Sequence, residues 1–131
     1  MKDSAGRHLI IDGYVKDKGV FTSEALTGLF HELVDALDMK IIQGPTFLEV
    51  ELDESKLSSD VFQDEGGITG SAIISTSHVA IHCWPLRRFF SMDVFSCKEF
   101  DAGVALGLIQ SKLGVTSSTV VNLDRMKPQR A

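Results

Sequence analysis

The stretch ITGSAIISTSHVAIHCWPLRRFFSMDVFSC (residues 68–97) decides the fold. It contains three apolar runs, 68–75, 78–84 and 89–97, in which β-branched and aromatic residues predict strands. Only a few residues separate one run from the next. Parallel strands need a crossover connection of a dozen or more residues, so these short breaks favour antiparallel neighbours joined by tight turns.

Two helices are predicted on either side of this stretch. Residues 22–38 place apolar side chains three and four positions apart, which gives one apolar stripe, and the Thr-Ser pair at the start can cap it. Residues 101–114 begin with Asp101 as a cap and end at Gly114. The remaining expectations are strands at 6–15, at 39–52 with a break near Gly44-Pro45, and at 116–125, and a polar loop at 53–67.

This order of elements predicts the fold class. A strand, a helix, several strands, a helix and a strand form an α+β two-layer sandwich, with two helices on one face of an antiparallel sheet. The chain has 131 residues, of which 44% are apolar and 24% charged. Such a chain fits one domain, residues 1–131, and can bury a core without metal or disulfide staples.

Composition and charge exclude several classes of function. The net charge is −5 and no basic stripe is present, so we expect no nucleic-acid partner. The first residues lack the apolar core of a signal peptide and no run is long enough to span a bilayer, so we expect a cytoplasmic protein without membrane contact. In that compartment Cys83 and Cys97 are expected to be free thiols, and two cysteines are too few for a cysteine-rich zinc site.

One of the apolar runs carries Ser77, His78, His82 and Cys83. Either this strand is half buried with its polar residues facing out, or it carries chemistry. A metal site on the two histidines is not expected, because four residues of strand separate them by about 13 Å. A hydrolase site with Ser77 as nucleophile, a histidine as base and Asp93 as orienter lacks the glycine-flanked elbow of many esterases. The alternative is that Ser77 only ends or bends the strand.

The block TGSAIISTSHVAIHCWPLRRFFSMDVFSCKEFD (69–101) resembles the central block of the small prokaryotic S-adenosylmethionine decarboxylases. That family has a glycine before an apolar strand, then Glu-Ser-His, then Ile-His-Thr-aromatic-Pro-Glu, then Asp-Val-Phe-Ser/Thr-Cys. The segment GRHLIIDGY (6–14) is similar to the family's opening Gly-x-His-x-x-x-Asp. The resemblance covers most of the chain in order and length.

The resemblance implies an inactive proenzyme that cleaves itself between Thr76 and Ser77 into fragments 1–76 and 77–131. Ser77 Oγ would attack the carbonyl carbon of Thr76 and turn the amide into an ester. Elimination would then break the chain, and loss of ammonia would leave a pyruvoyl group at position 77. A strained turn at this bond would favour the attack.

The resemblance also assigns roles to neighbouring residues. His82 is implied as the acid/base of processing, a role that suits a side chain titrating near neutral pH. Cys97 is implied as the proton donor to the decarboxylated carbon, His78 as a structural residue, and Cys83 has no implied role. The pyruvoyl group would hold the substrate amine as a Schiff base and accept electrons as carbon dioxide leaves, as pyridoxal phosphate does elsewhere. We therefore expect neither a metal nor pyridoxal phosphate.

Thr76 and Leu86 depart from the family pattern, which has glutamate at both places. The second glutamate is associated with holding the ribose hydroxyls of the substrate, and leucine cannot accept those hydrogen bonds. S-adenosylmethionine, decarboxylated for spermidine and polyamine biosynthesis, is the first expectation, and arginine or ornithine is the alternative that Leu86 fits. Phe62, Trp84 and the pair 89–90 offer aromatic faces for adenine or a sulfonium, or else pack in the core.

Two further expectations concern assembly and activity. The family forms homodimers of processed protomers with active sites at the interface, so the resemblance implies a homodimer that binds a small-molecule substrate. A different class of function is an unprocessed, non-catalytic relative that regulates an active form. Ser77, His82 and Cys97 are all retained, which argues against that alternative.

Overall fold

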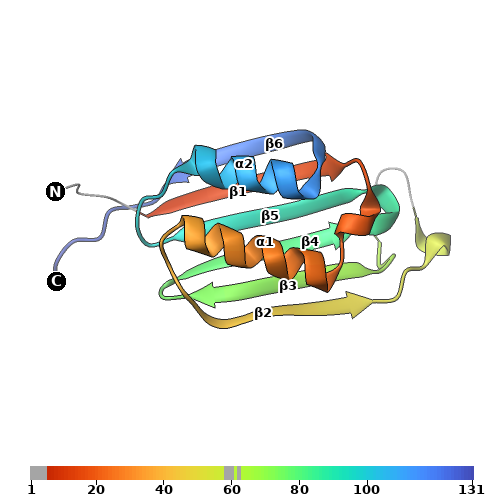
Figure 1. Cartoon of the computed structure of the whole chain (residues 1–131), viewed down its shortest axis with the longest axis horizontal. Coiled ribbons are helices and arrows are strands. Elements are labelled where there is room, and N and C mark those ends of the chain that lie inside the picture. Colours follow the sequence, from red (N-terminus) through yellow and green to blue (C-terminus); the bar gives the residue numbers. More distant parts are fainter. Residues whose placement is uncertain (1–5, 58–60, 62) are drawn as a thin grey trace.

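The computed structural model describes residues 6–57, 61 and 63–131 and has two layers, a six-stranded antiparallel sheet and two helices that cover one of its faces (Figure 1). The strand order is β2-β3-β4-β5-β1-β6. This architecture confirms the predicted α+β sandwich. The strands are β1 (Arg7–Val15), β2 (Ile41–Val50), β3 (Gly67–Ile74), β4 (Ser77–Trp84), β5 (Phe89–Ser96) and β6 (Val115–Asp124); the helices are α1 (Ser23–Ala36) and α2 (Ala102–Leu113), with short 3-10 turns η1 (Lys18–Val20), η2 (Glu54–Lys56) and η3 (Pro85–Arg87).

The three strands predicted from residues 68–97 are consecutive neighbours in the sheet. A two-residue turn, Ser75-Thr76, joins β3 to β4, and η3 joins β4 to β5. The break predicted near Gly44-Pro45 does not end a strand, because β2 runs through it. The register with β3 shifts there instead, since Gly44 adopts a φ of 91° and proline cannot donate to the ladder.

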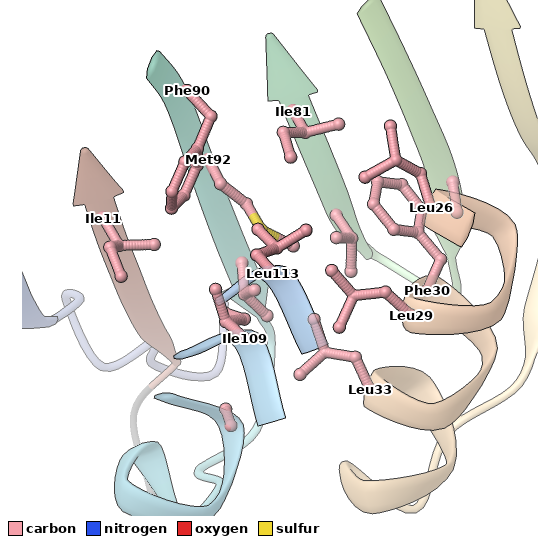
Figure 2. Close-up of a cluster of buried hydrophobic side chains, with 14 of the residues drawn as sticks. Ile11, Leu26, Leu29, Phe30, Leu33, Ile81, Phe90, Met92, Ile109 and Leu113 are labelled. Carbon is pink, nitrogen blue, oxygen red and sulfur yellow. The ribbon is translucent and has the colours of Figure 1, made fainter. Parts of the chain in front are cut away.

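The core lies between the helices and the sheet. Alternate residues of each central strand point toward the helices and are buried. Figure 2 shows how these side chains meet: Ile11, Ile81, Phe90 and Met92 come from the strands, Leu26, Leu29, Phe30 and Leu33 from α1, and Ile109 and Leu113 from α2. Both helices begin at the predicted caps, where Thr22 Oγ1 and Asp101 Oδ1 each accept a backbone N–H at 3.1 Å. No helix in the described part of the chain is long and apolar enough to cross a membrane.

We call the sheet face without helices the open face. Its residues form rows across the strands, which the register defines: His8, Phe95, His78 and Ile73 form one row, Ile10, Asp93, Ala80 and Ser71 the next, and Asp12, Ser91, His82 and Thr69 the third. The same face exposes large apolar side chains, namely Tyr14, Leu48, Ile73, Val121 and Leu123. The open face therefore combines polar rows with uncovered apolar surface.

Candidate active site

The turn between β3 and β4 is strained at Thr76. This residue has a φ of 51°, in the left-handed region. That region is unfavourable for L-residues and most unusual for a β-branched one. Turns of two residues normally place glycine, asparagine or aspartate at positive φ. The strain expected from the processing hypothesis therefore lies at the residue whose carbonyl Ser77 would attack.

Ser77 and Cys97 lie together beside this turn. Ser77 begins β4 and is almost fully buried, and Cys97 follows the last residue of β5. The backbone N–H of Cys97 donates to Ser77 Oγ at 2.9 Å, and Cys97 Sγ lies 3.7 Å from the carbonyl oxygen of Ser75. The structure thus brings together two of the three residues to which the resemblance assigns catalytic roles.

The two cysteines differ in the pKa of their thiols and in their exposure. Hydrogen bonds from the side chain of Thr76 and then of Ser77 lower the pKa of the Cys97 thiol below its ordinary value, and Cys97 is exposed. Burial among apolar side chains raises the pKa of Cys83 to about 12. Cys83 packs in the hydrophobic core.

His82 does not approach Ser77 within one chain. The two residues lie five positions apart on β4, so their side chains point to opposite faces and are separated by about 16 Å of strand. His82 lies on the open face, where Nδ1 is 3.0 Å from Thr69 Oγ1 of β3. The sequence did not predict Thr69 as a site residue. Its place directly opposite His82 in the β3–β4 pairing identifies it as the partner of this histidine.

His78 belongs to a different cluster on the open face. Its Nε2 lies 2.9 Å from Asp93 Oδ2, and the same oxygen lies 2.6 Å from His8 Nε2. Asp93 therefore orients two histidines, but neither faces Ser77, which excludes the hydrolase arrangement. The row positions also place His78 and His82 too far apart for one metal ion, as predicted.

The aromatic candidates lie at the other end of β4. Trp84 is half buried, and its ring centroid is 5.6 Å from that of Phe89. A hollow of about 160 Å³ beside it is lined by residues that include Thr69, His82 and Trp84. Phe90 packs in the core and offers no face to a ligand. Phe62 lies outside the described residues.

Leu86 lies in η3, a turn that is fixed by an ion pair between Arg87 and Glu65. Leu86 is half buried in η3, and the next residue, Arg87, bonds Glu65 with Nε and Nη2 at distances of 2.8 to 3.1 Å. The Glu65 side chain is 0% exposed and that of Arg87 16%. This pair fixes η3 against the segment before β3. It was not predicted from the sequence, because residues 53–67 were interpreted only as a polar loop.

Comparison with known proteins identifies the family. Residues 7–126 match the protein-family model described as S-adenosylmethionine decarboxylase. The chain belongs to this family. The match covers β1 through β6, including Ser77, His82 and Cys97.

Individual relatives support the assignment. An S-adenosylmethionine decarboxylase proenzyme of Geobacillus sp. (strain WCH70) is 38% identical over 63 residues, which are 47% of this chain and 51% of that protein. A proenzyme of the same description from Methanococcus maripaludis (strain C5) is 54% identical over 33 residues, 25% of this chain and 27% of that one. The chain thus spans about half or less of the length of these relatives. The crystal structure of the adenosylmethionine decarboxylase from Aquifex aeolicus has a TM-score of 0.69, 20% identity and coverage of 98% and 96% of the two chains, and it shows the shared fold.

Proposed function

We propose that this chain is a self-processing, pyruvoyl-dependent decarboxylase whose substrate is S-adenosylmethionine. Its product would supply aminopropyl groups for spermidine in polyamine biosynthesis. The observation that carries the proposal is the contact of Ser77 and Cys97 at the strained Thr76 turn. Family membership supports it independently.

Processing starts with attack of Ser77 Oγ on the carbonyl carbon of Thr76. The C–N bond between the two residues breaks as the ester forms. Elimination then releases Thr76 as a carboxylate and leaves a dehydroalanine at position 77, and hydrolysis of that residue releases ammonia. The remaining pyruvoyl group supplies an electron sink for decarboxylation. Cys97, which lies beside Ser77 in the uncleaved chain, delivers a proton to the substrate carbon.

His82 serves the processing site of a second copy in this proposal. Within its own chain it lies on the far side of the sheet from Ser77. The exposed apolar residues of the open face favour association of two copies through that face. We therefore propose a homodimer whose sites combine Ser77 and Cys97 of one protomer with Thr69 and His82 of the other.

Mixed chains test this composite site. Ser77→Ala removes the nucleophile and His82→Gln removes the base, so neither chain alone should cleave. Co-expressed with different tags, they should form mixed dimers in which the His82→Gln chain is cleaved, because its Ser77 faces an intact His82. Normal cleavage of His82→Gln alone would remove His82 from processing. Absence of cleavage in proven mixed dimers would refute the composite site.

The substrate alternative rests on Leu86. A leucine at this half-buried position offers no acceptor to ribose hydroxyls, which favours arginine or ornithine. The assay is carbon dioxide release from each of the three substrates by processed protein. If S-adenosylmethionine is the substrate, Leu86→Glu should leave its KM unchanged or lower it. Release from an amino acid alone would reassign the substrate and leave the pyruvoyl chemistry in place.

Intact-mass spectrometry tests the proposal as a whole. Purified protein should contain fragments 1–76 and 77–131, the second blocked by a keto group. Treatment with a hydrazine should add one hydrazone to that fragment and none to Ser77→Ala. A single uncleaved 14.3 kDa chain after prolonged incubation would favour the non-catalytic, regulatory relative instead.

A further inference from the structure

We propose that His8, His78 and Asp93 form a binding site for a divalent transition metal ion on the open face, with Zn²⁺ as the preferred ion. One oxygen of Asp93 lies 2.6 Å from His8 Nε2 and 2.9 Å from His78 Nε2. The three ligand atoms all lie within 4.8 Å of one another. The site is distinct from the Ser77–Cys97 centre, which faces the opposite side of the sheet at the end of β4, and the proposed decarboxylation does not depend on it.

The sheet positions the three ligands before any ion binds. His8 and His78 lie opposite Phe95 on either side of β5, and Asp93 lies two positions along β5 on the same face. The two imidazole rings lean over this strand, and their centroids are 6.1 Å apart. Because the ligands come from three hydrogen-bonded strands, little backbone entropy remains to be lost when the ion binds.

Within a single chain, an ion can reach the cluster from the open face. A hollow of about 250 Å³ lies beside it and is lined by residues that include His8, Asp93 and His82. Ala80, whose side chain is a single methyl group, lies opposite Asp93 on β4 and leaves this side open. In a single chain the ligand side chains are 18% (His8), 39% (His78) and 29% (Asp93) exposed, so an ion can reach them there without unfolding, whereas in the proposed homodimer the cluster lies in the interface.

The donor set selects the ion. Imidazole nitrogen and carboxylate oxygen suit Zn²⁺, Co²⁺ and Ni²⁺, whereas Mg²⁺ and Ca²⁺ prefer oxygen ligands alone. Metal–ligand distances of about 2.0–2.2 Å place tetrahedral ligand atoms roughly 3.3 Å apart. The observed Nε2···Oδ2 separations of 2.9 and 2.6 Å are therefore about 0.4 and 0.7 Å shorter than this spacing, so the side chains must rotate to admit an ion. Three protein ligands leave one position for water.

Arg125 competes with the metal by fixing the tautomer of His8. Its Nη1 lies 3.1 Å from His8 Nδ1, and because a guanidinium can only donate, Nδ1 must carry the lone pair and Nε2 the proton. Metal binding needs the opposite tautomer, in which an Nδ1–H would point at the guanidinium. Arg125 lies just beyond the end of β6 with its guanidinium 5.2 Å from the centre of the Phe95 ring, so it must swing away when the ion binds. Removing it should strengthen metal binding.

Co²⁺ and Zn²⁺ titrations of the untagged, chelator-treated full chain test this inference. One Co²⁺ should bind per chain with the visible absorption of a four-coordinate ion and no sulfur charge-transfer band, and Zn²⁺ should displace it. Asp93→Asn and His78→Gln should each weaken binding at least about 10-fold. Arg125→Gln should tighten it several-fold, while His31→Gln, which removes an exposed histidine on α1, should change nothing.

Several outcomes would overturn the site. These are no stoichiometric binding to the unaltered chain, equal affinity in Asp93→Asn and His78→Gln, or a thiolate band that places the ion at Cys97. Circular dichroism of each variant separates loss of a ligand from loss of the fold. Because Arg125→Gln predicts a gain in affinity, misfolding cannot mimic its expected result. Cleavage of the chain is scored separately, so failure of the metal site leaves the proposed decarboxylase function untouched, and the reverse also holds.

Discussion

Thr76→Gly should slow self-cleavage, because it removes strain that the attack of Ser77 releases. Thr76 has a φ of 51°. The left-handed conformation costs an L-residue roughly 1–2 kcal/mol, and glycine adopts it freely. As the Thr76 carbonyl carbon becomes tetrahedral and the peptide bond breaks, the turn is freed and this cost is recovered. If all of it is recovered in the transition state, glycine raises the barrier by about 1–2 kcal/mol, which is a roughly 5- to 30-fold slower rate.

A matched variant separates strain from hydrogen bonding. Thr76→Val keeps the β-branched side chain but removes Oγ1, which donates to the carbonyl oxygen of Ser75 at 2.8 Å. This variant should cleave at a rate close to that of the unaltered chain. The assay is pulse-labelled cell-free synthesis followed by a chase, in which the loss of full-length chain and the appearance of fragments 1–76 and 77–131 are timed.

Stability gives an independent measure of the strain. In the uncleavable Ser77→Ala background, Thr76→Gly should raise the free energy of unfolding by up to about 1 kcal/mol, because part of the relieved strain is offset by the larger unfolded-state entropy of glycine. Cleavage of Thr76→Gly as fast as the unaltered chain would refute the role of strain. Equal slowing of Thr76→Val and Thr76→Gly would assign the effect to the hydroxyl group instead.

Two other predictions concern the surroundings of the site. Glu65→Gln should lower the free energy of unfolding by roughly 3–5 kcal/mol in urea titrations, because it removes the charge of a fully buried carboxylate that is paired with Arg87. Glu32→Gln, which breaks an ion pair whose side chains are 47% and 49% exposed, should cost under about 1 kcal/mol. Thr76→Val should raise the pKa of Cys97, because it removes the first hydrogen bond that lowers it. Measured in the uncleavable Ser77→Ala chain, alkylation of the Cys97 thiolate should then require a higher pH. An unchanged pH profile of alkylation would mean that Thr76 does not affect the pKa of the thiol.

The elements of the fold were predictable because each rests on a local signal. The helix Ser23–Ala36 follows from its apolar stripe and cap. A two-residue turn follows from the short gap between apolar runs, although the observed turn at Ser75-Thr76 lies one residue before the predicted gap at residues 76–77. The path of β2 through Gly44-Pro45 was not predictable in this way. Glycine and proline usually end a strand, but here pairing with β3 continues past them through a shift in register.

The geometry of the candidate site was predictable only for residues that are close in the sequence or belong to a recognisable motif. The opposite orientations of Ser77 and His82 follow from the two-residue period of a strand, since the residues are five apart. The cluster of His8 and Asp93 does not follow from the sequence, because it depends on β1 inserting between β5 and β6 with a particular register. The positive φ of Thr76 is equally hidden, since threonine is not a residue that signals such a turn.

The two parts of the proposed composite site lie at different ends of β4, which favours a two-fold arrangement of two copies. Ser77 and the strained turn lie at one end of this strand, and His82, paired with Thr69, lies toward the other end, about 16 Å away. A symmetric interface repeats the same surface on both subunits, so a two-fold axis that crosses the middle of β4 at right angles, between two facing open faces, would exchange the two ends of this strand. That exchange would bring each His82 toward the Ser75-Thr76 turn of the other copy. The sheet would not separate them, because this turn lies beyond the last paired residues of β3 and β4. The middle row, which contains Ala80 and Asp93, would then lie nearest the axis, and the small side chain at Ala80 allows the two sheets to approach there.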